Sequence, residues 1–236
     1  MAKLRVATWN TEWRAKDSTD ACVIRERLNA FQPDIVCLTE THVDFLDEWS
    51  GYVVSGGTDW GGPTYGTRRE VLLWSRWPWR AVDTIGTPDL PQGRFASAVL
   101  DSPLGNITVA GIVIPYHMAN VRTGARDRRP WELHEQYLDA LPQITHRFPA
   151  RSLVLGDYNQ RIPSKWVPRA MRAKLQNAFA GLKIVSTGSL EPIGKPAIDH
   201  IAVGSAWGAA QVASISNLTS EGKQISDHFG VSAIIE

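Results

Sequence analysis

The chain of 236 residues has only two cysteines, Cys22 and Cys37, and no apolar run long enough to span a membrane. A membrane-spanning helix needs roughly 18 or more consecutive apolar residues, and the first ten residues contain no apolar signal core. A chain of this length can bury enough surface to fold without a disulfide. We therefore expect two free, buried thiols, with a single disulfide as the alternative, in a soluble protein of the reducing cytoplasm.

A large excess of charge of one sign is also absent. Lys and Arg number 25, Asp and Glu number 24, and the formal net charge is +1. This balance excludes a general nucleic-acid or membrane coat, so any attraction for phosphate must come from local basic clusters. Hydrophobic residues make up 43% and charged residues 21% of the chain, which excludes wholesale disorder. We find no repeat or linker and expect one domain over residues 1–236, present as a monomer.

Apolar runs of strand length recur along the chain and predict a mixed α/β fold. The runs cover residues 4–8, 35–38, 52–54, 71–74, 95–100, 107–114, 153–155, 182–185, 198–203, 212–215 and 231–235. Helical patterns cover residues 20–31, 130–148 and 168–180, and Pro142 should kink or shorten the second. Because a short turn joins runs 95–100 and 107–114, we expect a hairpin, and therefore a mixed rather than a purely parallel sheet.

Polar residues capable of chemistry stand at the ends of several predicted strands, where a rigid sheet can present a site. They are Asn10, Glu12, Glu40, His117, Asn120, Asp157, Asn159, Asp199, Asp227 and His228. Any one of them alone also has a structural explanation: Asn10 and the Gly-Asp-x-Asn segment as turn residues, Glu40 as a solvated carboxylate, and Asp199-His200 as a cap. Together, however, they supply the carboxylates, amides and imidazoles that a hard divalent cation and acid–base chemistry on a phosphate require.

The order of these residues resembles the endonuclease/exonuclease/phosphatase superfamily, which includes DNase I, exonuclease III, abasic-site endonucleases, inositol-polyphosphate 5-phosphatases and neutral sphingomyelinases. The matching motifs are Asn10, Glu40, His117, Gly156-Asp157-x-Asn159, Asp199 and Ser226-Asp227-His228, with the flanking segments 33–40 and 73–78. The resemblance extends from about Leu4 to Ile235. It implies a four-layer α/β (α+β) sandwich, in which two mixed β-sheets pack face to face between helices.

The resemblance also implies a metal site. Glu40 matches the main metal-binding glutamate of the family, Asn10 an asparagine that orients that site, and Asp227 a carboxylate near the metal. Mg²⁺ is the expected ion, with Mn²⁺ as a substitute. Glu12 stands where the abasic-endonuclease branch has aspartate and other branches have no acid, so its role stays open.

The same resemblance implies the catalytic groups. His228 matches the catalytic histidine and Asp199 the carboxylate that orients it, while Asp157 and Asn159 match the pair that positions the attacking water. Whether His228 or Asp157 takes the proton of the water stays open. His117 matches a residue that binds phosphate or protonates the leaving group.

Further assignments rest on weaker likeness. Glu70 resembles a glutamate that pairs with the His117 position, and Arg94 an arginine that contacts phosphate, although a plain charge pair at a strand edge explains both equally well. His200 stands at a variable position. We interpret His42, His134 and His146 as surface or helix residues.

The sequence leaves the phosphoester open. Two basic stretches follow predicted catalytic strands: residues 122–129, which include Arg122 close to Asn120, and residues 161–174, which include Arg161 and Lys165. They favour a nuclease that binds phosphates, with a solvated helix face as the alternative. Tryptophan is abundant, with ten in the chain, and the candidates to stack on bases are Trp60, Tyr65, Trp77 and Trp166, although tryptophan near strands is commonly core.

Three functions therefore compete. The first, which we favour, is a small endo- or exonuclease that hydrolyses DNA or RNA by in-line attack of water. The second is a phosphatase or a phospholipid or sphingolipid phosphodiesterase that acts on a phosphorylated small molecule or head group. The third is a scaffold with a degenerate site, which the intact motif residues argue against. The modest length leaves no room for long DNA-gripping insertions, so we expect little sequence selectivity.

Overall fold

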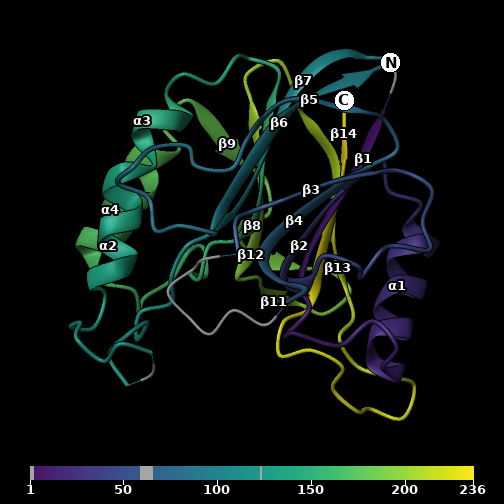
Figure 1. The fold of residues 1–236 in the computed structure, drawn as a ribbon, viewed down its shortest axis with the longest axis horizontal. Coiled ribbons are helices and arrows are strands. Elements are labelled where there is room, and N and C mark those ends of the chain that lie inside the picture. The colour runs from purple at the N-terminus through teal and green to yellow at the C-terminus, as the bar shows by residue number, and fades with distance from the viewer. Residues whose placement is uncertain (1–2, 59–65, 123) are drawn as a thin grey trace.

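The computed structural model describes residues 3–58, 66–122 and 124–236, and its main feature is a pair of mixed β-sheets packed face to face (Figure 1). Helix α1 (Thr19–Phe31) covers the outer face of one sheet, and helices α2 (Glu132–Ala140), α3 (Pro142–Thr145) and α4 (Arg169–Ala178) cover the outer face of the other. The predicted four-layer α/β sandwich is thereby confirmed.

Each sheet contains six strands. In the first, the order is β13 (Ala209–Ile215), β14 (Gly230–Ile235), β1 (Leu4–Asn10), β2 (Ile35–His42), β4 (Arg68–Ser75) and β3 (Tyr52–Ser55). In the second, it is β5 (Trp79–Asp83), β6 (Phe95–Ser102), β7 (Gly105–Val113), β8 (Ser152–Asp157), β12 (Asp199–Gly204) and β9 (Leu182–Ile184). A separate two-stranded ribbon joins β10 (Ser189–Leu190) to β11 (Lys195–Pro196).

Strand direction places the predicted site residues at one end of the sandwich. The pairs β1–β2 and β7–β8 are parallel within their sheets, and a hydrogen bond from Asn10 to Asp157 brings the ends of β1 and β8 together. β12 runs antiparallel to β8 and opens with Asp199 opposite Asp157. β14 runs antiparallel to β1, so the segment before it, which contains His228, returns to the same end.

The helices begin and end where the sequence predicts. The Ser18 hydroxyl accepts a hydrogen bond from the Ala21 amide and caps α1, which ends before Gln32 and Pro33. Pro142, which cannot donate a backbone hydrogen bond, divides the predicted second helix into α2 and α3. None of the helices among the described residues has the length and apolar character needed to cross a bilayer.

Apolar side chains fill three layers. Residues of both sheets, including Val6, Cys37, Val109 and Leu155, form the core between the sheets. Side chains of α2 and α4 pack on the second sheet, and those of α1 pack on the first.

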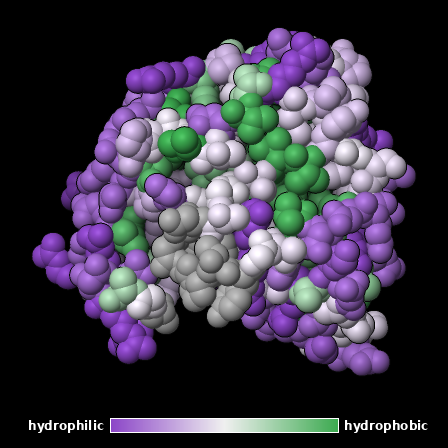
Figure 2. Space-filling view, in the orientation of Figure 1, coloured by the Kyte–Doolittle hydropathy of each residue, from purple (hydrophilic) through white to green (hydrophobic). Residues whose placement is uncertain are grey.

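Two sequence predictions fail at the surface. Both thiols are free, but Cys22 on α1 is exposed and only Cys37 is buried, because Cys22 lies on the helix face turned away from the sheet. The sequence pattern does not predict the edge strand β5, because its residues are mostly exposed and form no apolar run. It lies beside edge strand β3, where Figure 2 shows apolar residues on the surface.

Gly156 lets β8 approach β7 closely just before Asp157. Its φ angle is +137°, and a Cβ atom there would overlap the carbonyl oxygen of Ile112. We expect Gly156→Ala to lower the free energy of unfolding by about 3 kcal/mol, because it adds both strain and overpacking. Gly181, with no heavy atom within 4 Å of an added Cβ, is the matched control. Urea denaturation of both variants checks this, and equal stabilities would contradict it.

Candidate active site

A hydrogen bond between the two sheets lies at the centre of the predicted site. Asn10, at the end of β1, donates from Nδ2 to Asp157 Oδ2 at 3.3 Å, although the two residues belong to different sheets. Its Oδ1 accepts the Glu12 amide at 2.8 Å, and its backbone carbonyl accepts the Ser226 hydroxyl at 2.7 Å. The motifs around residues 10, 157 and 226 are thus joined by direct hydrogen bonds.

The buried Asp157 carboxylate is held mainly by Asn159. Oδ1 accepts the Asn159 amide at 2.8 Å and Oδ2 accepts Asn159 Nδ2 at 3.0 Å. Burial, followed by the negative charges of Asp199 and Glu40, raises the pKa of Asp157 to about 8, although the nearby His228 acts in the opposite direction. At neutral pH this carboxyl group is therefore able both to accept and to release a proton.

His228 and Asp199 form an imidazole–carboxylate pair. Nδ1 of His228 lies 2.6 Å from Asp199 Oδ2. Burial alone would lower the pKa of His228, but the charge and hydrogen bond of Asp199, with the charges of Asp157 and Asp227, raise it to about 10. Because an ionised carboxylate only accepts hydrogen bonds, Nδ1 carries a proton and Nε2 remains for substrate or water.

Several largely buried carboxylates, among them Glu40 and Asp199, lie in or near this pair and favour binding of a positive charge. Burial and the charge of Glu70 raise the pKa of Glu40 to about 7, with a smaller contribution from Asp227 and an opposing hydrogen bond from Asn10. Buried Asp199 Oδ1 finds no hydrogen-bond partner among the described residues. The oxygen donors of Glu40, Asn10 and Asp227, with Glu40 largely buried near other carboxylates, are of the kind that suits a hard divalent cation, so the predicted group fits one chemically.

The donor atoms that lie closest together form a different set. Donor atoms of Asp157, Asp199 and His228 all lie within 4.8 Å of one another. The 2.6 Å contact within this set shows that His228 and Asp199 bind each other. We therefore interpret these three residues as an acid–base cluster beside the predicted metal site.

Asp227 and Glu12 are acidic residues nearer the surface, and they are linked through the Asp227 backbone amide. The Asp227 side chain is exposed, and its backbone amide donates to Glu12 Oε2 at 3.1 Å. Glu12 also accepts a hydrogen bond from Arg14 at 2.7 Å. Glu12 thus links the start of the chain to the Ser-Asp-His segment, whatever its role toward a metal.

Glu70 pairs with Arg94 rather than with His117. Arg94 Nη1 lies 3.1 Å from Glu70 Oε2, and Glu70 is buried. Burial raises the pKa of Glu70, and Arg94 counters this. The exposed His117 ring packs instead against Trp131, with ring centroids 5.4 Å apart. The predicted pairing of Glu70 with His117 is therefore wrong, and Glu70 pairs with Arg94.

The two predicted basic stretches differ in how much charge they leave free. In the first, Arg128 and Arg129 both form ion pairs with Glu132, while Arg122 is exposed and the Asn120 carbonyl accepts the Arg128 amide. These ion pairs partly neutralise the first stretch.

In the second stretch, Lys174 forms ion pairs with Glu135 and Asp139, whereas Arg161 and Lys165 are exposed. Arg169 and Arg172 are exposed as well, so ion pairing lowers the charge of this stretch mainly at Lys174, and Arg161 carries the exposed charge that follows Asp157 most closely in sequence.

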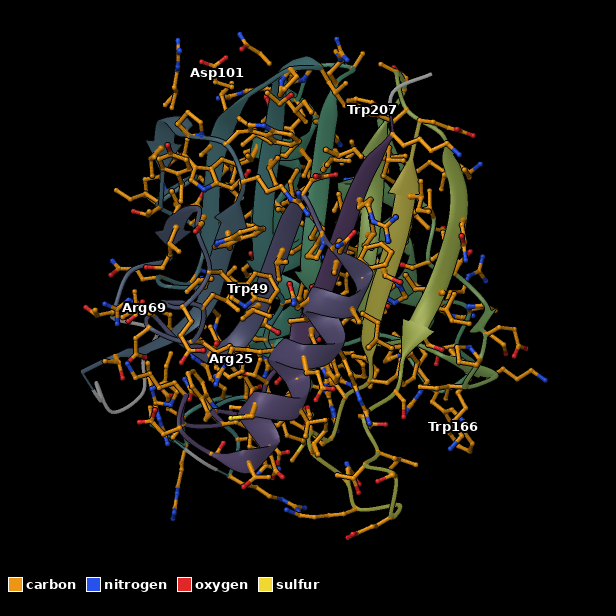
Figure 3. All side chains as sticks on the ribbon, turned by 90° about the vertical axis from the view of Figure 1, so that its right-hand side faces the viewer. Arg25, Trp49, Arg69, Asp101, Trp166 and Trp207 are labelled. Atoms are coloured by element: carbon orange, nitrogen blue, oxygen red, sulfur yellow. The ribbon has the colours of Figure 1, made fainter. Side chains whose placement is uncertain are left out.

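The aromatic candidates divide clearly. Trp166 is 94% exposed and extends from the periphery of the molecule in Figure 3. Trp77 packs against the core between the sheets, which disfavours stacking on a substrate. Trp60 and Tyr65 lie outside the described residues.

A cavity of about 390 Å³ adjoins the imidazole–carboxylate pair. Asp199, His228 and Asp227 line one part, and Arg161, Lys195 and the apolar residues Ile193 and Phe229 line the rest. Lys195 is absent from the sequence prediction because it lies on the short strand β11, which no motif marks. The cavity therefore combines two cations with the predicted catalytic groups.

Two histidines have surroundings that the sequence does not reveal. His134, assigned to the surface or to a helix, lies on α2 but is buried, and His200 is buried as well. Both form hydrogen bonds with the buried Gln160, which directly follows Asn159. His42 is partly buried and binds the Thr67 hydroxyl, and His146 is exposed, as expected.

The sequence was compared with models of protein families and with curated proteins. The family model for the Endonuclease/Exonuclease/phosphatase family matches residues 7–228. No curated protein matches the sequence of this chain.

Solved structures share the fold at low identity. A humanised D. rerio TDP2 is 16% identical, with a TM-score of 0.70 and 99% of each chain covered. A 3′ phosphatase, NExo, from Neisseria, bound to a product DNA hairpin, is 19% identical, with a TM-score of 0.71 and 98% of each chain covered. An AP endonuclease from Archaeoglobus fulgidus is 16% identical, with a TM-score of 0.71 and 98% of each chain covered. The match over nearly the whole sequence shows that the chain belongs to the endonuclease/exonuclease/phosphatase family.

Proposed function

We propose that this protein is a divalent-metal-dependent phosphodiesterase that acts on nucleic acid. The observation that carries the proposal is the contact of buried Asp157 with Asn10 and Asn159, beside the His228–Asp199 pair. This cluster offers a proton acceptor, an amide donor and an imidazolium at one place. Those are the groups that in-line hydrolysis of a phosphoester requires.

The chemistry divides among the residues according to their charge. Since the pKa of His228 is raised to about 10, its imidazolium stabilises negative charge on the phosphoryl oxygens. Burial raises the pKa of Asp157, which makes its ionised form a stronger base, and this form accepts the proton of the attacking water. Asn159 holds Asp157 in place through two hydrogen bonds. This division makes Asp157 the general base in the proposed mechanism.

Glu40, Asn10 and Asp227 would hold the divalent cation. When bound, such an ion supplies Lewis-acid stabilisation of charge on the phosphate, and Mg²⁺ suits the oxygen donors. Burial, and then the negative charges of Glu70 and Asp227, raise the pKa of Glu40, and this cost of its own charge supports the assignment, because a cation would offset it.

Nucleic acid is favoured by charge and aromatic exposure outside the catalytic cluster. Arg161 and Lys165 are exposed just after the Asp157 motif, and the exposed Trp166 follows them. A cationic groove with an aromatic stacking surface is typical of proteins that bind single strands. Solved structures of the same fold include NExo with a product DNA hairpin and D. rerio TDP2 with a single-strand DNA product.

A phosphatase or head-group phosphodiesterase is the second candidate. The cavity of about 390 Å³, with Arg161 and Lys195 in its lining, has the size of a small-molecule site. A phosphorylated metabolite or lipid head group would place a second phosphate against these cations.

The substrate class is tested with a panel in the presence of Mg²⁺, Mn²⁺ or EDTA. We expect nicking or trimming of DNA or RNA with either metal and its loss in EDTA, because the metal neutralises the transferring phosphoryl group. Plasmid relaxation, oligonucleotide gels and phosphate release from inositol phosphates and sphingomyelin are the measurements. Turnover of head-group substrates alone would reject the nuclease, and EDTA-resistant turnover would reject the metal.

The roles of Asp157 and His228 are tested by substitution. We expect Asp157→Asn and His228→Ala each to reduce kcat by at least about 10³-fold, because each removes a group that acts on the reacting atoms. Circular dichroism should show both variants folded. Near-normal turnover in either folded variant would overturn its assignment.

The cations of the cavity are tested separately from the chemistry. We expect Arg161→Gln and Lys195→Gln each to raise KM about fivefold, which corresponds to about 1 kcal/mol for an exposed ion contact, with kcat little changed. The effect should shrink at high salt. Lys183, exposed on β9 and paired opposite Val203, is the control cation. An unchanged KM in both variants would remove the cavity from substrate binding.

A further inference from the structure

Gln160 lies between two buried histidines immediately behind the candidate site. Its side-chain nitrogen lies 2.7 Å from His134 Nε2, and its backbone carbonyl accepts His200 Nε2 at 2.9 Å. All three side chains are buried, with Gln160 only 2% exposed. The proposed chemistry uses none of them, so their hydrogen bonds require an explanation.

The proton positions on His134 follow from its partners. Nδ1 lies 2.7 Å from the Pro115 carbonyl oxygen, which can only accept, so Nδ1 carries the proton. Burial lowers the pKa of His134 to about 4 and keeps the ring neutral. Nε2 is then an acceptor, and the Gln160 amide must donate to it. The hydrogen bonds therefore run in one direction, from the Gln160 amide to His134 and from His134 to the Pro115 carbonyl.

The same argument fixes His200. Nε2 donates to the Gln160 carbonyl, so Nδ1 accepts the Ser186 hydroxyl at 2.9 Å. The Ser186 oxygen in turn accepts the Ile201 amide at 3.0 Å. Burial lowers the pKa of His200, which keeps this ring neutral as well. Gln160 is thus fixed through its side chain on one side and its backbone on the other.

These contacts form a closed loop with the site. Asn159 Nδ2 donates to the Ile114 carbonyl at 2.8 Å and to Asp157 at 3.0 Å. Pro115 and Gln160, which follow Ile114 and Asn159 in the segments after β7 and β8, are joined through His134. The ends of β7 and β8 are therefore tied twice, once by a site residue and once by the buried histidine.

We propose that Gln160, His134 and His200 are positioning residues for the site, which hold Asn159 and the segment that leads from Pro115 to His117 in register. Asn159 has a φ angle of +49°, a left-handed conformation that Asn adopts more readily than most residues when its side chain forms local hydrogen bonds, as here to Asp157 and Ile114. The two neutral histidine rings, each hydrogen-bonded through both nitrogens, and the Gln160 amide that donates to His134 support this arrangement without adding charge next to Asp157. The proposal rests on the proposed function for its effect on turnover.

The test compares Gln160→Leu and His134→Asn with a matched control. Leucine removes the link to His134, while asparagine at position 134 can keep a donor for Pro115 but is too short to reach Gln160. Thr145→Val is the control, because Thr145 is also buried and donates to Ala178 at 2.6 Å, between α3 and α4 and away from the site.

We expect both site-side variants to lose kcat about 10- to 100-fold with KM within about twofold, because a shift of about 1 Å in a catalytic group has effects of this size. Thr145→Val should lower the melting temperature comparably and keep kcat. Amide hydrogen exchange provides a readout independent of turnover: segments 112–120 and 156–162 should exchange faster in the first two variants only. His134→Asn serves alone if Gln160→Leu does not fold.

The outcomes separate this proposal from the proposed function. If kcat and exchange in the site-side variants match those of Thr145→Val, the positioning role is wrong, even where Asp157→Asn remains inactive. If the wild-type protein hydrolyses no phosphoester, the proposed function fails, and the exchange comparison still decides whether the three residues hold the two segments.

Discussion

The buried carboxylate of Asp157, placed where the two sheets meet, is the constraint on which the rest of the site depends. A buried charge is costly unless it is paired and hydrogen-bonded. Asn159 from its own loop and Asn10 from the other sheet supply those hydrogen bonds. The same interactions therefore satisfy the carboxylate and fix the register between the sheets. The raised pKa shows that the compensation is incomplete, which leaves the group chemically active.

The partners of three histidines show how this protein directs protonation. His228 lies against the carboxylate of Asp199, and its pKa is raised. His134 and His200 lie against carbonyl and hydroxyl groups, and burial lowers the pKa of each. The three rings are all largely buried, so the partner rather than burial decides which ring is charged. One cation thus stands in the proposed reaction centre, and neutral rings stand behind it.

The strands, and the polar residues that flank them, are the features of the fold and the site that the sequence could predict. The apolar runs and the polar residues beside them identify the sheets and place residues 10, 157 and 199 at strand ends, residue 40 near the end of β2, and residue 228 just before β14. Partners across long distances could not be predicted. The Glu70–Arg94 pair and the Gln160 network join segments whose contact depends on sheet packing. Cys22 was misplaced because helix orientation, not composition, decides which face is covered.

The fold determines which basic residues are neutralised by ion pairs and which remain free to bind phosphate. Arg128, Arg129 and Lys174 are basic in sequence clusters, yet Glu132, Glu135 and Asp139 of α2 pair with them. At the cavity the cations are not neutralised in this way, because Asp199 there pairs with His228 while Arg161 and Lys195 also line the cavity. A near-neutral chain can therefore still attract a polyanion at short range, since beyond about 10 Å salt screens the remaining charges. Recognition then depends on groups within reach of the reacting phosphate, which is consistent with a compact domain whose cavity directly adjoins its acid–base cluster.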